Sequence, residues 1–114
     1  MKDCIFCKIA NNEIPCIKIY EDEKVIAFKD INPAAPIHVL VIPKEHITSV
    51  NDINESNKLI ISHIFITISK IAKDLNIDKE GFRVITNTGE RGGQTVDHLH
   101  FHLLGGRDLG WPPG

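Results

Sequence analysis

The sequence has no apolar run long enough to cross a membrane, no excess of basic charge and few cysteines. A membrane-spanning helix needs about 20 consecutive apolar residues. The 13 basic and 15 acidic residues give a net charge of −2, which excludes the basic surface that non-specific nucleic-acid binding requires. Three cysteines in 114 residues do not make a disulfide framework. We therefore expect neither a membrane partner nor a nucleic-acid partner.

The chain also has no internal repeat, no low-complexity tract and no linker. Its first residues, 1–4, lack the apolar stretch of a signal peptide, so we expect a cytoplasmic protein. A hydrophobic content of 42% and a charged content of 25% are usual for a soluble globular protein. A chain of 114 residues is long enough to bury one hydrophobic core. We expect a single domain, residues 1–114.

Hydrophobic periodicity predicts one long helix and five strands. Apolar residues recur at intervals of three and four between about Ser56 and Leu75, as on an amphipathic helix. They are Ile61, Ile64, Phe65, Ile68, Ile71, Ala72 and Leu75. The predicted strands are residues 17–20, 25–28, 38–42, 82–86 and a histidine-rich run that begins at Asp97. Pro33 and Pro36 make residues 30–36 a loop. This order predicts an α+β domain with a mainly antiparallel sheet.

Three histidines stand at every second position of the last predicted strand: His98, His100 and His102. On a strand, residues i, i+2 and i+4 share one face, so the histidines should face one side while Leu99, Phe101 and Leu103 face the core. Imidazole can act as a nucleophile, an acid, a base or a metal ligand near neutral pH. The pattern favours a functional site over its alternatives, a polar strand face or a crowded metal site.

Cys4 and Cys7 form a C-x-x-C pair. Two thiolates at this spacing can share one zinc ion, but a closed structural site needs four ligands, so two distant histidines would have to complete it. A redox dithiol is the first alternative, although no βαβ pattern surrounds the pair. The second alternative is two thiols without a function. Cys16 is interpreted as a buried core residue, and His63, on the helix, as a solvated or core-edge residue.

Together these motifs resemble the histidine triad family, specifically the branch of histidine triad nucleotide-binding proteins. The resemblance covers nearly the whole chain. It rests on residues 4–9, 13–15, 20–22, 27–36, 38–47, 87–89, 92–96, the H-x-H-x-H run and the terminal Trp111-Pro112-Pro113-Gly114. This last motif favours the purine nucleoside phosphoramidase branch over the dinucleotide hydrolase branch. The resemblance also implies a short N-terminal helix beside the long central one.

The resemblance implies a small-molecule partner of the purine nucleoside monophosphate type. Family members cleave a bond at its α-phosphorus, often a P–N bond, through a nucleotidylated histidine, here His100. His102 and His38 would donate to the phosphate oxygens, His98 completes the triad, and Thr95, where the family often has serine, would assist the leaving amine. The implied nucleotide-binding residues are Phe6, Ile14, Phe28, Asp30, Ile31, Asn87, Gly93, Gln94, Thr95, His100 and His102. Taken without the resemblance, Phe28, Ile14 and Ile31 fit a core equally well, and Asp30 fits the start of a turn.

The resemblance also completes the zinc ligand set. In members that carry C-x-x-C, the other ligands correspond to His46 and His98, and the Zn²⁺ bound by Cys4, Cys7, His46 and His98 would be structural. It further implies a homodimer in which the helix and an edge strand pair two five-stranded sheets into a ten-stranded one. The functional alternatives are a dinucleoside polyphosphate hydrolase, a nucleotide-binding regulatory protein with incidental catalysis, and a zinc-binding interaction module.

Overall fold

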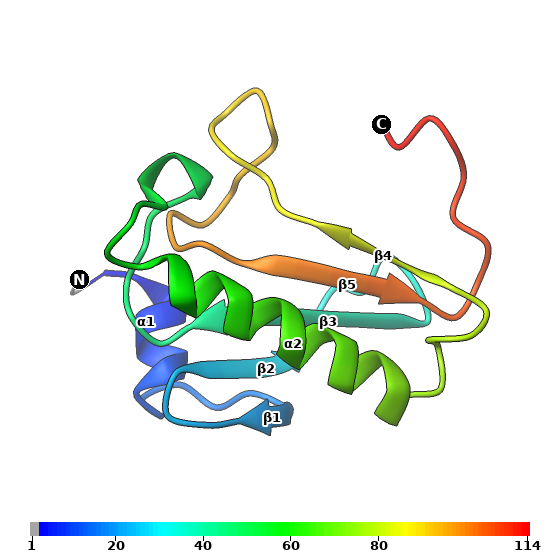
Figure 1. The fold of residues 1–114 in the computed structure, drawn as a ribbon, viewed down its shortest axis with the longest axis horizontal. Helices are drawn as coiled ribbons and strands as arrows, with labels where there is room; N and C mark the ends of the chain where they lie inside the picture. The colour runs from blue at the N-terminus through cyan, green and yellow to red at the C-terminus, as the bar shows by residue number, and fades with distance from the viewer. Residues whose placement is uncertain (1–2) are drawn as a thin grey trace.

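The computed structural model describes residues 3–114 as an α+β fold, with one antiparallel sheet between a long helix and a short one (Figure 1). The elements follow in the order α1 (Ile5–Ala10), β1 (Lys18–Glu21), β2 (Val25–Lys29), β3 (Ile37–Pro43), a 3-10 turn at Val50–Asp52, α2 (Lys58–Asp74), β4 (Phe82–Ile85) and β5 (Phe101–Gly105). The predicted five-stranded α+β architecture is confirmed. Among residues 3–114, no helix has the length and apolar character needed to span a membrane.

The strands lie in the order β1-β2-β3-β5-β4, and every neighbouring pair is antiparallel. β3 is the central strand, between β2 and β5, while β1 and β4 form the two edges. In the β3–β5 register, Leu40 is opposite His102 and His38 is opposite Leu104. Because alternate residues share a face, His38 and His102 are diagonal neighbours on the same side of the sheet.

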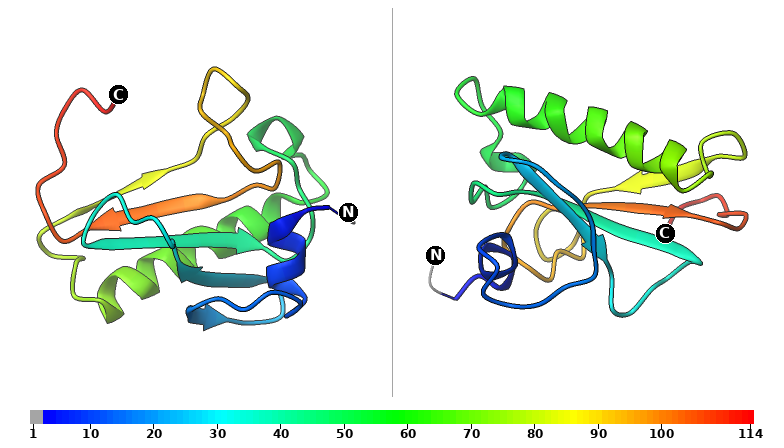
Figure 2. Two further views of the ribbon diagram at one scale, coloured as in Figure 1. Left: turned by 180° about the vertical axis from the view of Figure 1, so that it is seen from behind. Right: turned by 90° about the horizontal axis from the view of Figure 1, so that it is seen from below.

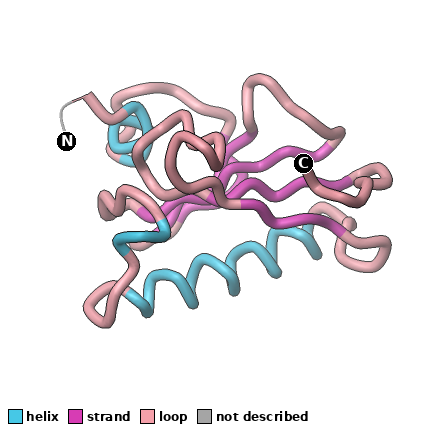
Figure 3. Tube along the Cα trace, turned by 90° about the horizontal axis from the view of Figure 1, so that it is seen from above, coloured by secondary structure: helices cyan, strands magenta, loops and turns pink. Residues whose placement is uncertain are grey.

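The helix α2 covers one face of the sheet, and α1 lies on the other (Figures 2 and 3). On the α2 face, a buried cluster joins Leu99, Phe101 and Leu103 to Ile64 and Ile68 of the helix. The α1 face has a second buried cluster: Phe6, Ile9, Ala10, Ile26, Phe28, Leu40 and Ile42. The isoleucines of α2 are weak helix formers, so burial of this stripe supplies most of the stability of the helix.

Two predictions about the elements need correction. The last strand begins at Phe101, not at Asp97, because the pairing of β3 with β5 ends at Val41 opposite Phe101. Before that point the backbone turns away, and the amide of Leu99 donates instead to the carbonyl of Ile47 at 2.6 Å. Phe65, predicted within the buried stripe of the helix, is 48% exposed and touches Phe101 only edge-on, with ring centroids 5.4 Å apart.

Candidate active site

The side chains of His98, His100 and His102 all lie on the α1 face, as their alternation predicts, although only His102 is within β5. The Phe6 ring of α1 meets those of His98 and His100 edge-on, at centroid distances of 6.1 and 5.0 Å. The ring of His102 lies 5.1 Å from those of both His100 and His38. The fold therefore gathers four imidazoles on one side of the sheet.

The orientation of His100 is fixed by a backbone carbonyl. Its Nδ1 lies 2.7 Å from the carbonyl oxygen of His98. A carbonyl only accepts hydrogen bonds, so Nδ1 of His100 carries the proton and donates it. In the neutral ring the lone pair is then on Nε2, on the side away from that carbonyl. His100 is only 5% exposed, and it can act as a nucleophile through Nε2.

A second chain of hydrogen bonds fixes the tautomers of His38 and His102. The amide of Ala34 donates to Nδ1 of His38 at 3.0 Å, so the proton of neutral His38 is on Nε2. That nitrogen lies 2.9 Å from Nδ1 of His102 and donates to it. His102 must then carry its own proton on Nε2. The backbone amide thus fixes the donor and acceptor nitrogens of both neutral rings. As a result, the Nε2–H group of His102 is available to stabilise negative charge.

Burial keeps these rings neutral. It lowers the pKa of His102 to about 4, with further contributions from His100 and His38. Burial also lowers the pKa of His38, although the nearby Asp30 carboxylate opposes this effect. At neutral pH both residues therefore serve as neutral hydrogen-bond donors.

Asp30 contributes to this cluster and also forms a turn. Its Oδ1 accepts the amide of Asn32 at 2.8 Å, as the turn interpretation predicts, while Oδ2 lies 3.4 Å from Nε2 of His38. Asp30, His38 and His102 bring three donor atoms within 4.8 Å of one another. A metal bound at Nε2 of His38 would have to displace the proton that the Ala34 amide places there. The geometry therefore favours a hydrogen-bond relay at this position over a metal site.

An apolar cavity of about 280 Å³ adjoins these histidines. Its lining includes eight of the predicted nucleotide-binding residues: Phe6, Ile14, Phe28, Asp30, Ile31, Thr95, His100 and His102. Phe28 is buried and meets the ring of Phe6 edge-on at 5.6 Å, whereas Ile31 is 90% exposed and forms the rim. Ile31 is thus not a core residue. Cys16 packs against the second buried cluster, as its interpretation as a core residue predicts, but it is only half-buried because it also lines this cavity.

Three other predicted nucleotide-binding residues do not line the cavity: Asn87, Gly93 and Gln94. The side chain of Asn87 donates to the carbonyl of Gly92 at 2.7 Å, and that of Gln94 donates to the carbonyls of Thr48 and Val96. Gly93 has a φ of +83°, which favours glycine. These residues stabilise the loop that carries Thr95.

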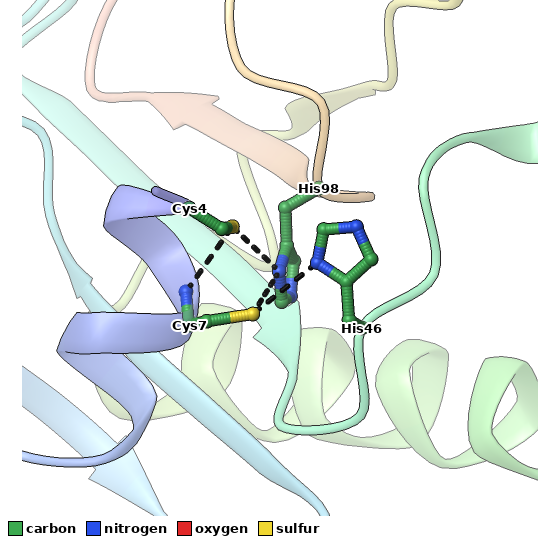
Figure 4. A group of neighbouring side chains, drawn as sticks. All are labelled: Cys4, Cys7, His46 and His98. Carbon is green, nitrogen blue, oxygen red and sulfur yellow. Dashed lines mark hydrogen bonds between the residues drawn. The ribbon is translucent and has the colours of Figure 1, made fainter. Parts of the chain in front are cut away.

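The four predicted zinc ligands converge at the start of α1 (Figure 4). Cys4 and Cys7 come from the first turn of that helix, His46 from the segment after β3, and His98 from just before β5. Their ligand atoms all lie within 4.8 Å of one another. The sulfur–nitrogen distances between these side chains are 3.2 to 3.5 Å, against about 3.6 Å between neighbouring S and N ligands around a tetrahedral zinc.

The hydrogen bonds of His98 also suit a metal ligand. Its Nε2 lies 2.8 Å from the carbonyl of Pro43 and donates to it, so Nδ1 presents its lone pair to the sulfurs. Burial lowers the pKa of His98 to about 4, which keeps the ring in the neutral form that coordinates. Burial, followed by the interactions with Cys4, raises the pKa of the Cys7 thiol, and a bound cation would oppose this shift by stabilising the thiolate. The donor set fits zinc.

Some contacts of the structure have no signal in the sequence. The backbone groups that orient the histidines, at Ala34, Pro43 and His98, show no side-chain pattern. His63 is half-buried, and its Nε2 lies 2.6 Å from Oδ2 of Asp22, which joins α2 to the β1–β2 turn. Pairing across 41 residues leaves no local motif.

A four-imidazole site on a sheet-and-helix scaffold, beside an apolar cavity, defines the class to which this protein belongs. The HIT domain family model matches residues 11–109, and the chain belongs to this family. An uncharacterised HIT-like protein of Synechococcus elongatus is 47% identical over 99% of this chain and 98% of its own length. The fold matches the crystal structure of a HIT family hydrolase from Legionella pneumophila with a TM-score of 0.97 and 46% identity, covering 98% and 100% of the two chains. It also matches a histidine triad nucleotide-binding protein from Candida albicans, with a TM-score of 0.82, 38% identity and coverage of 96% and 83%.

Proposed function

We propose that this protein is a hydrolase of nucleotides that cleaves at the α-phosphorus of a purine nucleoside monophosphate derivative, with a P–N bond as the preferred target. The main observation in support of this proposal is the tautomer of His100. Its Nδ1 donates to the carbonyl of His98, which leaves Nε2 as a free nucleophile in a residue that lines the apolar cavity. The Legionella and Candida relatives, described as a hydrolase and as a nucleotide-binding protein, support the same reading.

The nucleoside would bind in the apolar cavity, with its base between Phe28 and Ile14 and its ribose hydroxyls at Oδ2 of Asp30. The base contacts are apolar side chains, which suits a flat purine ring. Oδ2 is the acceptor available to the ribose hydroxyls, because Oδ1 already accepts a hydrogen bond from the Asn32 amide.

Catalysis would proceed in two displacements. Nε2 of His100 attacks the α-phosphorus, and the electron pair of the P–N bond goes to the leaving amine, which takes up a proton from water on the side of Thr95. The Nε2–H group of His102 donates to a phosphate oxygen as its charge rises. Water then attacks the same phosphorus and releases a proton to solvent, the bond to His100 breaks with its electron pair returning to Nε2, and the nucleoside monophosphate leaves.

The proposal includes a structural zinc ion at Cys4, Cys7, His46 and His98. When bound, this ion would tie α1, which carries the cavity wall residue Phe6, to the segment that carries the triad. A helix of six residues is marginal by itself, so this link would stabilise the wall.

The proposal also includes a homodimer. The edge strand β4 and the exposed apolar residues of α2 provide surfaces that a partner copy would cover. Leu59 and Ile66 of α2 are 78% and 68% exposed, and Phe82 of β4 is 37% exposed.

A substrate comparison tests the proposed reaction. The wild-type protein should turn over a fluorogenic adenosine phosphoramidate with a kcat/KM at least about tenfold above that for a dinucleoside polyphosphate, since the cavity adjoining His100 matches one nucleoside. The opposite order would favour the dinucleoside polyphosphate hydrolase. Binding of AMP without turnover of either substrate would favour the regulatory protein.

A further inference from the structure

The segment that follows β5 contacts the loop that orients His38. We call residues 30–36 the proline loop. The Nη2 of Arg107 donates to the carbonyl of Ala34 at 2.9 Å, while its Nη1 donates to the carbonyl of Asp108 at the same distance. Beside it, Gly106 has a φ of +90°, and a Cβ added there would lie 2.9 Å from Cβ of Pro36. The end of β5 thus packs closely on the proline loop.

These contacts belong to a chain of hydrogen bonds that begins and ends in the same stretch of the protein. Arg107 holds the carbonyl of Ala34, and the amide of Ala34 donates to His38. His38 donates in turn to His102. His102 and Arg107 belong to one stretch of chain, because β5 ends at Gly105. A change at Arg107 can therefore reach His102 through the proline loop as well as along the strand.

We propose that Arg107 is a positioning residue that fixes the tautomers of His38 and His102 through Ala34. Residue 34 is exposed and lies in a loop outside the sheet ladders, so few contacts hold the direction of its amide. The carbonyl lies in the next peptide plane, so a guanidinium bonded to it restricts rotation of the backbone at Ala34 and, through this backbone, the direction of the amide. If the amide turned away, only the Asp30 carboxylate, 3.4 Å from Nε2, would favour the proton on that nitrogen of His38, and His102 would be held less firmly with its proton on Nε2.

Arginine suits this role because its guanidinium stays protonated throughout the pH range in which histidines titrate. Its charge strengthens the hydrogen bond to a neutral carbonyl. Arg83 provides a matched control within the same chain. Its Nη2 also donates to backbone carbonyls, those of Leu109 and Gly110, but these belong to the C-terminal tail and not to the proline loop.

The test measures tautomers directly and activity separately. Protein labelled with ¹⁵N-histidine is compared at neutral pH as wild type, Arg107→Ala, Arg107→Lys and Arg83→Ala, because imidazole nitrogen shifts report which ring nitrogen carries the proton. In the wild type, His38 and His102 should be protonated on Nε2. Arg107→Ala should give mixed tautomers at both residues, Arg107→Lys should restore part of the wild-type pattern, and Arg83→Ala should leave it unchanged. Arg107→Met, which keeps an unbranched side chain but has no donor, provides the same comparison if the alanine variant does not fold.

The activity measurement rests on the proposed function, whereas the tautomer measurement does not. On the phosphoramidate, Arg107→Ala should lower kcat about fivefold, as expected for one weakened hydrogen bond, and change KM less than about twofold. Wild-type tautomers in folded Arg107→Ala, or equal tautomer mixing in Arg83→Ala, would overturn the proposal. If the tautomers shift as described but the wild type turns over no nucleotide, the proposed function fails and the positioning role of Arg107 stands.

Discussion

The carbonyl oxygen of His98 accepts a hydrogen bond from Nδ1 of His100 at 2.7 Å. The imidazole of the same His98 faces the sulfurs of Cys4 and Cys7 through its own Nδ1. One residue therefore connects the candidate metal centre with the candidate nucleophile. Its side chain belongs to the first and its backbone orients the second, so the two can be separated by experiment.

The first prediction concerns the nucleophile. His100→Ala and His100→Gln should lower turnover at least about 10³-fold, because the covalent step is lost, while AMP still binds in the apolar cavity. Mass spectrometry of wild-type enzyme quenched during turnover should find a nucleotidyl adduct on the peptide that carries His100. His63→Gln is the control, since His63 pairs with Asp22 away from this cavity and should remain active. An adduct on His98 or His102 would contradict the assignment.

The second prediction concerns the metal. Protein purified without chelator should contain about one zinc per chain by elemental analysis, and the double variant Cys4→Ser, Cys7→Ser should contain none. Losing the metal should lower the free energy of unfolding by at least about 2 kcal/mol, seen as a lower Tm, because metal binding contributes to folding. The chemical rate should fall less. Cys16→Ser is the matched control, as Cys16 lies outside the cluster and should keep the metal. Unchanged metal content in the double variant would refute the site.

The strong periodic features of this protein could be predicted from the sequence. The isoleucine stripe of residues 61–72 predicted α2, and the alternation from Leu99 to Leu103 predicted which residues face the helix. Both patterns record burial on one face, which is a property of the side chains. The start of β5 could not be predicted, because it depends on where β3 stops pairing, and backbone pairing leaves no mark in the side chains.

The candidate site also has features that could be predicted from the sequence and features that could not. The imidazoles and thiols were identified because few other side chains perform their chemistry. Their protonation could not be predicted, since it depends on the backbone amide of Ala34 and the backbone carbonyls of Pro43 and His98. Asn87 and Gln94 were assigned to the nucleotide from the family resemblance alone, and the structure shows Asn87 bonded within its own loop and Gln94 bonded to Thr48 and Val96.

The third prediction concerns pH and stability. Burial lowers the pKa of His102 to about 4 from the 6.5 of an unfolded histidine, and His38, His100 and Asp30 are the titratable groups that face it. Between these values the unfolded chain binds more protons than the folded one, so stability rises with pH across this window. The Tm should therefore fall as the pH is lowered from about 6.5 towards 4. The slope should be smaller in His102→Gln, and equal slopes would contradict the assignment.

The fourth prediction concerns assembly. Light scattering at low micromolar concentration should give the mass of a dimer for the wild type and of a monomer for Ile66→Glu, because a buried carboxylate would oppose the interface. Ile17→Glu is the matched control. Ile17 is 63% exposed, close to the 68% of Ile66, but it precedes β1 at the other edge of the sheet. Loss of the dimer in both variants would show that the effect is not specific to α2, and a monomeric wild type with full activity would refute the requirement for a dimer.

The fifth prediction concerns the C-terminal tail. Two prolines keep Trp111-Pro112-Pro113-Gly114 out of helix and sheet ladders, and Trp111 is 83% exposed. Within residues 3–114, Arg83 attaches the tail through the carbonyls of Leu109 and Gly110.

In the proposed dimer the exposed indole would find its apolar contact near the active site of the partner copy, where it would touch the leaving group. Deleting residues 109–114 should therefore change the ratio of kcat/KM between a small and a bulky leaving amine at least about threefold, while the Tm falls little. Trp111→Ala should reproduce most of this change if the indole makes the contact. Equal ratios in the wild type and the truncated protein would show that the tail does not act on the substrate.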